Sequence, residues 1–168
     1  MTVTLTPITT TVTVTVGTNS YASVATADAF LATDYALATA WDALTADEKA
    51  RALVTATRHI DGLRLIGYKA VDTQALAFPR TFATPYHCPT CDDDYTVQAT
   101  VPQAVIDATC MEAASLISDG RDALRADGVS EYTIGSLHEK LSGGARALRS
   151  KDALRLLKPY VMVAVPIR

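Results

Sequence analysis

The sequence has few charged and few aromatic residues, and it lacks a long apolar run. Charged residues make up 20% of its 168 positions and aromatic residues 7%, whereas soluble domains usually carry about 25% charged residues. The net charge of −3 argues against a protein whose main task is to hold nucleic-acid phosphates, because such proteins are usually basic. No apolar run reaches the ~18 residues of a membrane-spanning helix. Residues 1–7 lack the basic and apolar regions of a signal peptide, so none is expected.

Cysteine is also scarce. The odd number of three, Cys88, Cys91 and Cys110, is not that of a disulfide scaffold and favours synthesis in a reducing cytosol. Cys88 and Cys91 form a Cys-x-x-Cys turn preceded by His87, which is half of a zinc knuckle, since two thiolates on a tight turn reach one tetrahedral ion. The second half is missing, so His87, Cys110, a carboxylate or a neighbouring subunit would have to complete the site. The alternative, which we prefer, is a surface loop with two free thiols.

The residue combinations that catalysis needs are absent as well. The sequence contains no Gly-rich phosphate loop, no Ser/His/Asp arrangement and no suitably spaced carboxylate pair, so we expect no enzyme. His59 is predicted to be a half-exposed structural histidine, because a general base needs an oriented partner and a nucleophile. Acidic residues nearby dilute any phosphate-binding face, so a mixed, solvated surface is predicted for five basic residues. They are Arg51, Arg58, Arg64, Lys69 and Arg80.

What the sequence does contain is a distinctive pattern at each end. Residues 1–18 form an arm rich in Thr and Val, whose strict alternation is typical of a strand with one apolar face. Residues 161–168 form an apolar arm that is too short to fold by itself. Because neither arm can satisfy its backbone groups alone, we expect at least one of them to pair with a neighbouring subunit or another protein. The predicted contact residues are Val12, Val14, Val16, Val161, Val163, Val165 and Ile167.

Residues 19–160, between the arms, are predicted to form one helical domain. The predicted helices cover residues 23–35, 45–65, 102–120 and 147–160, with a short helix or turn at 121–126 and Trp41 in a short connection or a separate turn. Ser23 is a plausible N-cap, and Thr45 with Glu48 forms a capping box. Core candidates recur at helical spacing along these segments. They are Phe30, Leu31, Leu53, Ala56, Ile60, Leu63, Ile106, Cys110, Ala113, Ile117, Leu154, Leu156 and Leu157.

The segments between these helices are predicted to be loops or extended chain. Gly and Pro punctuate residues 66–100, of which 82–100 form a loop insertion. Phe78 precedes a proline, so it is expected to be extended and to bury its ring against the helix that carries Leu53 and Ile60. Residues 130–141 alternate and suit a short extended segment or hairpin. The predicted fold class is therefore mainly α: a small helical bundle with extended, β-type N- and C-terminal arms.

The order of several short segments resembles one protein family. The segments are Asn19–Val24, Ala27–Phe30, Trp41 ahead of the Thr45 cap, Ala56–Asp61, Gly67, Gln74–Arg80 and Val101–Val105. In this order and spacing the chain resembles the head–tail connector proteins of tailed phages. These are also called adaptor or head-completion proteins and are often catalogued as DnaT-like single-stranded-DNA-binding proteins. The resemblance covers residues 19–81 and 101–120 and, more loosely, Gly135 and 154–160. The insertion at 88–94 and the long Thr-Val arm depart from it.

The resemblance implies a structural virion protein without a reaction or a cofactor. Such a protein is assembled in the host cytoplasm into a ring, typically of twelve copies, under the portal. The ring joins the filled head to the next neck or tail protein, and double-stranded DNA passes through its lumen without sequence-specific binding. No membrane is involved.

Two other functions are open. A single-stranded-DNA-binding module of phage replication should show aromatic residues on a basic groove. The aromatic residues that can be placed on helices here are expected to be buried, so the ring is the preferred interpretation. A small zinc-dependent regulator is the third, and it rests only on Cys88 and Cys91.

The cysteine turn generates the first prediction. Protein purified without chelators should carry no zinc in elemental analysis, because half a knuckle offers too few ligands for a closed tetrahedral site. The opposite result is one zinc per chain that is lost in Cys88→Ser, and it would establish the metal site in place of the loop.

Overall fold

The structure, a computed structural model, describes residues 11–83, 95–117, 131–134, 137–140 and 148–162. Its helices are α1 (Val24–Leu31), α2 (Ala38–Asp42), α3 (Ala46–Asp61), α4 (Gln103–Ile117), α6 (Lys151–Leu157) and the 3-10 turn η1 (Lys158–Tyr160). Its strands are β1 (Tyr68–Lys69), β2 (Arg80–Ala83), β3 (Tyr95–Val97), β4 (Glu131–Ile134) and β5 (Leu137–Lys140). The predicted class, mainly helical with some extended segments, is confirmed. No helix in these ranges is long and apolar enough to cross a membrane.

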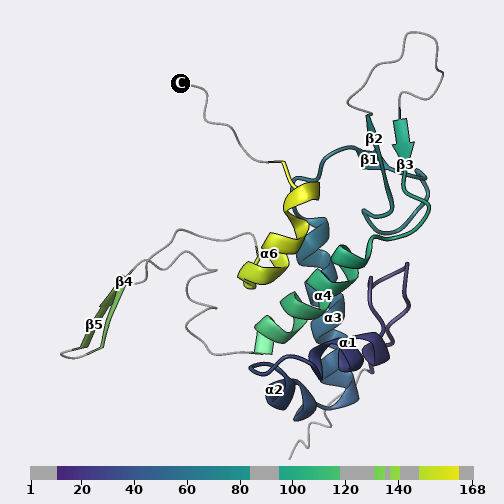
Figure 1. The fold of residues 1–168 in the computed structure, drawn as a ribbon. Coiled ribbons are helices and arrows are strands. Elements are labelled where there is room, and N and C mark those ends of the chain that lie inside the picture. Colours follow the sequence, from purple (N-terminus) through teal and green to yellow (C-terminus); the bar gives the residue numbers. More distant parts are fainter. Residues whose placement is uncertain (1–10, 84–94, 118–130, 135–136, 141–147, 163–168) are drawn as a thin grey trace, which may run out of the picture.

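Helices α3 and α4 lie side by side at the centre, with α6 packed against α4 and α1 and α2 at one end (Figure 1). The predicted capping box starts α3: the amide of Glu48 donates to Thr45 Oγ1 at 3.3 Å, and the Thr45 amide donates to the Glu48 carboxylate at 2.8 Å. Ser23 caps α1 as predicted.

Several helices are shorter than predicted. The first ends at Leu31 rather than near Tyr35, and α3 ends at Asp61, because Gly62 follows it as the C-cap. The last begins only after Ser150, whose side chain accepts from the Ala153 amide and so caps it. Pro102 lies just outside α4, not in its first position, and Trp41 lies on the short helix α2, which agrees with a separate turn rather than a connection. The predicted stop at Gly120 and the segment 121–126 lie outside the described residues.

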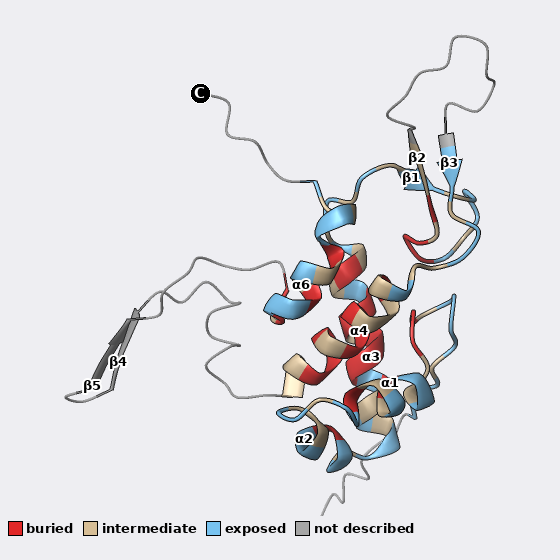
Figure 2. Cartoon of the chain, in the orientation of Figure 1, coloured by how far each residue is buried: buried red, intermediate tan, exposed pale blue. Residues whose placement is uncertain are grey.

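The core has two parts, and buried residues concentrate where α3, α4 and α6 meet (Figure 2). One cluster includes Ile60 and Phe78, and the other includes Leu53 and Trp41. Phe78 is 2% exposed, as predicted, but Leu53 belongs to the other cluster. Instead, the Phe78 ring makes edge contacts with Tyr21 and Tyr160, at centroid distances of 5.9 and 5.5 Å. The prediction was therefore correct for Ile60 and wrong for Leu53.

Polar contacts close the end of the bundle near α1 and α2. Trp41 Nε1 and Lys49 Nζ donate to the carboxylate of Asp28 at 2.7 and 2.8 Å, and Lys49 also lies 5.4 Å from the centre of the Trp41 ring. Burial opposes the charge on Asp28, but these two hydrogen bonds outweigh it and lower the pKa of Asp28. The buried indole is thereby satisfied at its one polar atom.

Residues 66–100, predicted to be loops or extended chain, contain a small antiparallel sheet in the order β1-β2-β3 that the sequence did not predict. The register pairs Tyr68 with Thr81, and Thr81 with Val97. These strands have two, four and three residues, which is too short for the period-two pattern that reveals a strand in a sequence. The hairpin predicted near 130–141 is confirmed as the pair β4–β5.

The described part of the N-terminal arm packs on its own chain. Val12 and Val14 are half-buried while the threonines around them are exposed, so the predicted apolar face exists. It forms no strand among residues 11–15, because Val14 packs on the helical core and the Val12 amide donates to Asp47 at 2.8 Å. Val16 is 56% exposed and makes a single bridge to Ser20.

The C-terminal arm also begins on its own chain. Val161 forms an antiparallel bridge with Leu65, the Met162 amide donates to the Arg64 carbonyl at 2.8 Å, and the Ile66 amide donates to Tyr160 at 2.8 Å. The side chain of Val161 packs on the core. The other predicted contact residues of this arm, Val163, Val165 and Ile167, lie outside the described residues.

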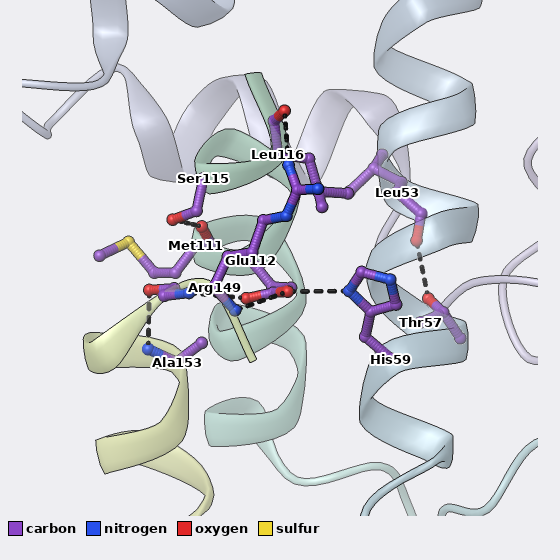
Figure 3. A network of polar contacts seen from close by, with 10 residues as sticks. Leu53, Thr57, His59, Met111, Glu112, Ser115, Leu116, Arg149 and Ala153 are labelled. Carbon is purple, nitrogen blue, oxygen red and sulfur yellow. Dashed lines mark hydrogen bonds and ion pairs between the residues drawn. The ribbon is translucent and has the colours of Figure 1, made fainter. Parts of the chain in front are cut away.

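A buried carboxylate joins the three central helices. Glu112 of α4 has no exposed surface, and Figure 3 shows its carboxylate between α3 and the start of α6. Its oxygens accept from the backbone amides of Arg149 and Ser150 at 3.1 and 2.9 Å, and His59 Nδ1 of α3 lies 2.9 Å away. Arg149 Nη1 in turn donates to the Leu116 carbonyl at 3.5 Å. His59, with a side chain 36% exposed, has the structural role predicted for it.

Glu112→Ala should therefore destabilise the fold by roughly 3 kcal/mol or more, because it leaves buried amides without an acceptor. Urea unfolding measures the loss. Asp107→Ala is the matched control, because it also removes a carboxylate from α4. The hydrogen-bond partner of Asp107 is the exposed side chain of Gln103. Equal stability of the two variants would contradict the role given to Glu112.

Candidate functional site

A groove runs along the exposed side of α6 and the residues that follow it. It has a volume of about 440 Å³ and is lined by Lys151, Leu154, Arg155, Lys158, Val161 and Met162. We call these six residues the α6 groove. Its floor is apolar, because Leu154 and Val161 pack on the core beneath it while Met162 remains 54% exposed.

Three cations border the α6 groove. Lys151, Arg155 and Lys158 are spaced by four and three residues, which places them along one side of a helix. All three are exposed. Arg155 pairs with Asp152 at 2.9 Å, whereas neither lysine has an ion pair with another residue in the described part of the chain. The groove therefore presents positive charge next to apolar surface.

The chain that pairs with the end of the groove adds a fourth cation and an aromatic ring. From Gly62 to Tyr68 exposed and half-buried residues alternate, and Arg64, Ile66 and Tyr68 are the exposed side chains after α3. We call these three residues the 64–68 strip. Because Leu65 and Val161 form the bridge and pack inward, the strand geometry puts Arg64 and Met162 on the outer side. Tyr68 is 75% exposed.

Arg80 holds the 64–68 strip in place through hydrogen bonds to its backbone. This side chain is 7% exposed and donates from Nε to the Ile66 carbonyl at 2.7 Å, from Nη1 to Ala77 at 3.1 Å and from Nη2 to Gly67. Its guanidinium also lies 5.8 Å from the centre of the Phe78 ring. Burial lowers the pKa of Arg80, and the nearby Tyr21 and Asp61 act in the opposite direction. The prediction of a solvated Arg80 is therefore wrong: its side chain is buried, and its donors satisfy backbone carbonyls instead of water.

Gly67 allows the backbone of the 64–68 strip to pass close to β2. Its φ is +78°, and a Cβ added there would lie 2.2 Å from the carbonyl oxygen of Thr81. Only glycine fits such a position without displacing backbone. Beyond it, Tyr68, Thr81 and Val97 form one cross-strand row, in which Tyr68 and Val97 are largely exposed. The outer face of the sheet thus continues the exposed apolar surface of the strip.

A second polar cluster holds the turn before β2. The hydroxyl of Tyr21 donates to Asp61 and accepts from the Phe78 amide at 3.1 Å, and the Ala77 amide donates to the other oxygen of Asp61 at 3.2 Å. Burial, the largest influence, raises the pKa of Tyr21 and of Asp61, although the hydrogen bonds to Asp61 oppose its shift. This cluster is internally satisfied, so it serves the fold.

The residues predicted to hold metal, His87, Cys88 and Cys91, lie outside the described residues, so the zinc hypothesis stays a prediction. In the described ranges no three His, Cys, Asp or Glu residues are grouped to hold an ion. Cys110 is buried in α4, and burial raises the pKa of its thiol to about 12. It is packed as a small core residue, as predicted.

Of the five basic residues singled out in the sequence, only Arg64 is found beside the groove. Arg58 lines a separate hollow with Thr18 and Asn19, Arg51 pairs with Asp47, and the Lys69 ammonium donates to the Gln74 carbonyl. Lys151, Lys158 and Tyr68 were not predicted from the sequence. The signal for the two lysines was their spacing with Arg155, whereas Tyr68 lacked one because its strand has two residues.

Arg80→Lys should lower the free energy of unfolding by roughly 2 kcal/mol, because one ammonium cannot reach three backbone carbonyls as the guanidinium does. Arg64→Lys is the control, since Arg64 is exposed, and it should leave the urea midpoint nearly unchanged. If Arg80→Lys unfolds at the wild-type midpoint, Arg80 does not hold the strip.

Comparison with known proteins places the chain in a family. A family model described as "Putative DnaT-like ssDNA binding protein" matches residues 6–166. No curated protein and no solved structure matches the chain. Because the family model spans almost the entire sequence, including α1 to α6 and the whole groove, this chain belongs to the DnaT-like ssDNA binding protein family.

Proposed function

We propose that this protein binds single-stranded DNA through the α6 groove and the 64–68 strip. The observation that carries the proposal is the gathering of the exposed cations Lys151, Arg155 and Lys158 around the α6 groove. Exposed Arg64 is joined to the end of this groove by the backbone hydrogen bond from Met162. Family membership supports it, because the family description gives this ligand. The cations are positioned to bind phosphates, and Tyr68 is exposed enough to stack on a base.

The net charge of −3 does not oppose this proposal. Phosphate contacts depend on the local field, and a small cationic groove can act on a protein whose total charge is slightly negative. The number of cations limits the strength instead. Four phosphate contacts give a salt slope of at most about −3, so binding is expected to be moderate and to weaken steeply with salt.

The test is fluorescence anisotropy with a labelled oligothymidine at low salt. Replacing both Lys151 and Lys158 by Glu should lower the affinity roughly tenfold or more and flatten the salt dependence. Arg58→Glu is the control for each lysine replaced singly, because it too reverses one exposed cation, on α3 and away from the groove. Equal losses in these single variants would mean that the groove has no special role, and absence of wild-type binding would reject the function.

A second candidate is the ring-forming neck protein of a tailed phage, with the portal and a downstream neck or tail protein as partners. Its support is the segment order that resembles connector proteins, together with the acidic net charge, which suits a lumen through which double-stranded DNA slides. The exposed row Tyr68–Thr81–Val97 offers a surface for a neighbouring copy. Light scattering with and without portal protein separates the candidates: a ring mass without oligothymidine binding favours the neck protein.

A further inference from the structure

The α6 groove has a feature that phosphate binding does not require. A site for phosphates alone needs cations and solvent, whereas this groove has a floor of Leu154, Val161 and Met162. Its volume of about 440 Å³ lies within the roughly 300–1,000 Å³ of pockets that enclose small organic groups. We therefore expect the ligand to place an apolar group, flat or compact, on this floor where the cations gather.

The cations and the floor have a definite arrangement. Lys151 and Lys158 are seven residues apart, so they lie about 10 Å apart along the helix axis, and Leu154 comes between them in the sequence. At the far end, Met162 lies beside Arg64. A ligand that fits must therefore carry negative charges on both sides of an apolar group. A nucleotide within a single strand has this form, with a phosphate on each side of its base.

We propose that the α6 groove takes up an unstacked base of single-stranded DNA, while the flanking phosphates contact Lys151, Lys158 and Arg64. This inference rests on the proposed function and names the part of the ligand that fills the groove. The floor has no hydrogen-bonding side chain, so it contacts the flat surface of a base and not its edges. Any of the four bases is accepted.

The arrangement gives a physical source for strand selectivity. Bases in a duplex are stacked and paired, and removing one from the stack costs a few kcal/mol. Phosphates are present in both forms, so the cations alone would hold a duplex as well. The apolar floor therefore favours the single strand, in which bases are free to leave their neighbours.

The experiment compares an oligothymidine with an abasic oligonucleotide of equal length, which has the same phosphates and no bases. The measurement is made on a Tyr68→Leu variant, so that stacking on Tyr68 does not contribute. Introducing Met162→Gln into this variant should weaken oligothymidine binding roughly fivefold or more and leave abasic binding unchanged. The control is Val97→Gln, because Val97 is 59% exposed, close to the 54% of Met162, and lies on the outer sheet face.

The outcomes are separate for the two proposals. If the abasic strand binds as tightly as oligothymidine, and Met162→Gln changes neither, the groove holds no base although the protein still binds DNA. Equal weakening by Val97→Gln would likewise overturn the assignment to the groove. If neither oligonucleotide binds but polyglutamate does, the groove is a site for acidic peptides, and both proposals fail.

Discussion

The buried carboxylate of Glu112 is the contact on which the arrangement of the bundle depends. It lies inside the protein, where an unpaired charge would be very costly, and three donors from α3 and the start of α6 surround it. Two of those donors are backbone amides ahead of α6, so the carboxylate fixes where that helix begins. His59 supplies the third from the side of α3. A hydrophobic residue at this position could pack, but it could not orient α6 relative to both neighbours.

The exposed groove follows from this buried contact. Once α6 is placed, Leu157 and Ala153 face the core, and the opposite side with Lys151, Arg155 and Lys158 must face outward. The chain then turns through η1 and pairs with the segment after α3, which brings Met162 next to Arg64. Arg80 fixes the position of that segment as Glu112 fixes α6, because its buried side chain donates to the carbonyls of Ile66 and Gly67. Two buried charged side chains thus hold the two halves of one exposed surface.

The composition and the surface support different functions when each is considered alone. A slightly acidic chain with few aromatic residues argues against a protein whose main task is to hold nucleic acid, and Trp41 and Phe78 are indeed buried. The folded surface, however, gathers four cations and leaves Tyr68 exposed, which favours a nucleic-acid ligand. Average charge reports on solubility and on long-range attraction, whereas phosphate binding depends on charges within a few ångströms. The local arrangement therefore carries more weight for the proposed function.

The sequence by itself determined where α1 and α3 begin, because those signals are local: Ser23 and Thr45 cap through residues three positions away. It also predicted the burial of Phe78, Ile60 and Leu157 and the hairpin near 130–141. The tertiary structure alone decided the roles of Glu112 and Arg80, since sequence patterns treat a charged residue as exposed unless its partners are known. Apart from Ala77, which is three residues from Arg80, these partners are 13 to 53 residues away. It also decided the short sheet, which depends on long-range pairing, and the meeting of α6 with the 64–68 strip. No spacing within either segment encodes that contact, because it arises only when both pack against the same core.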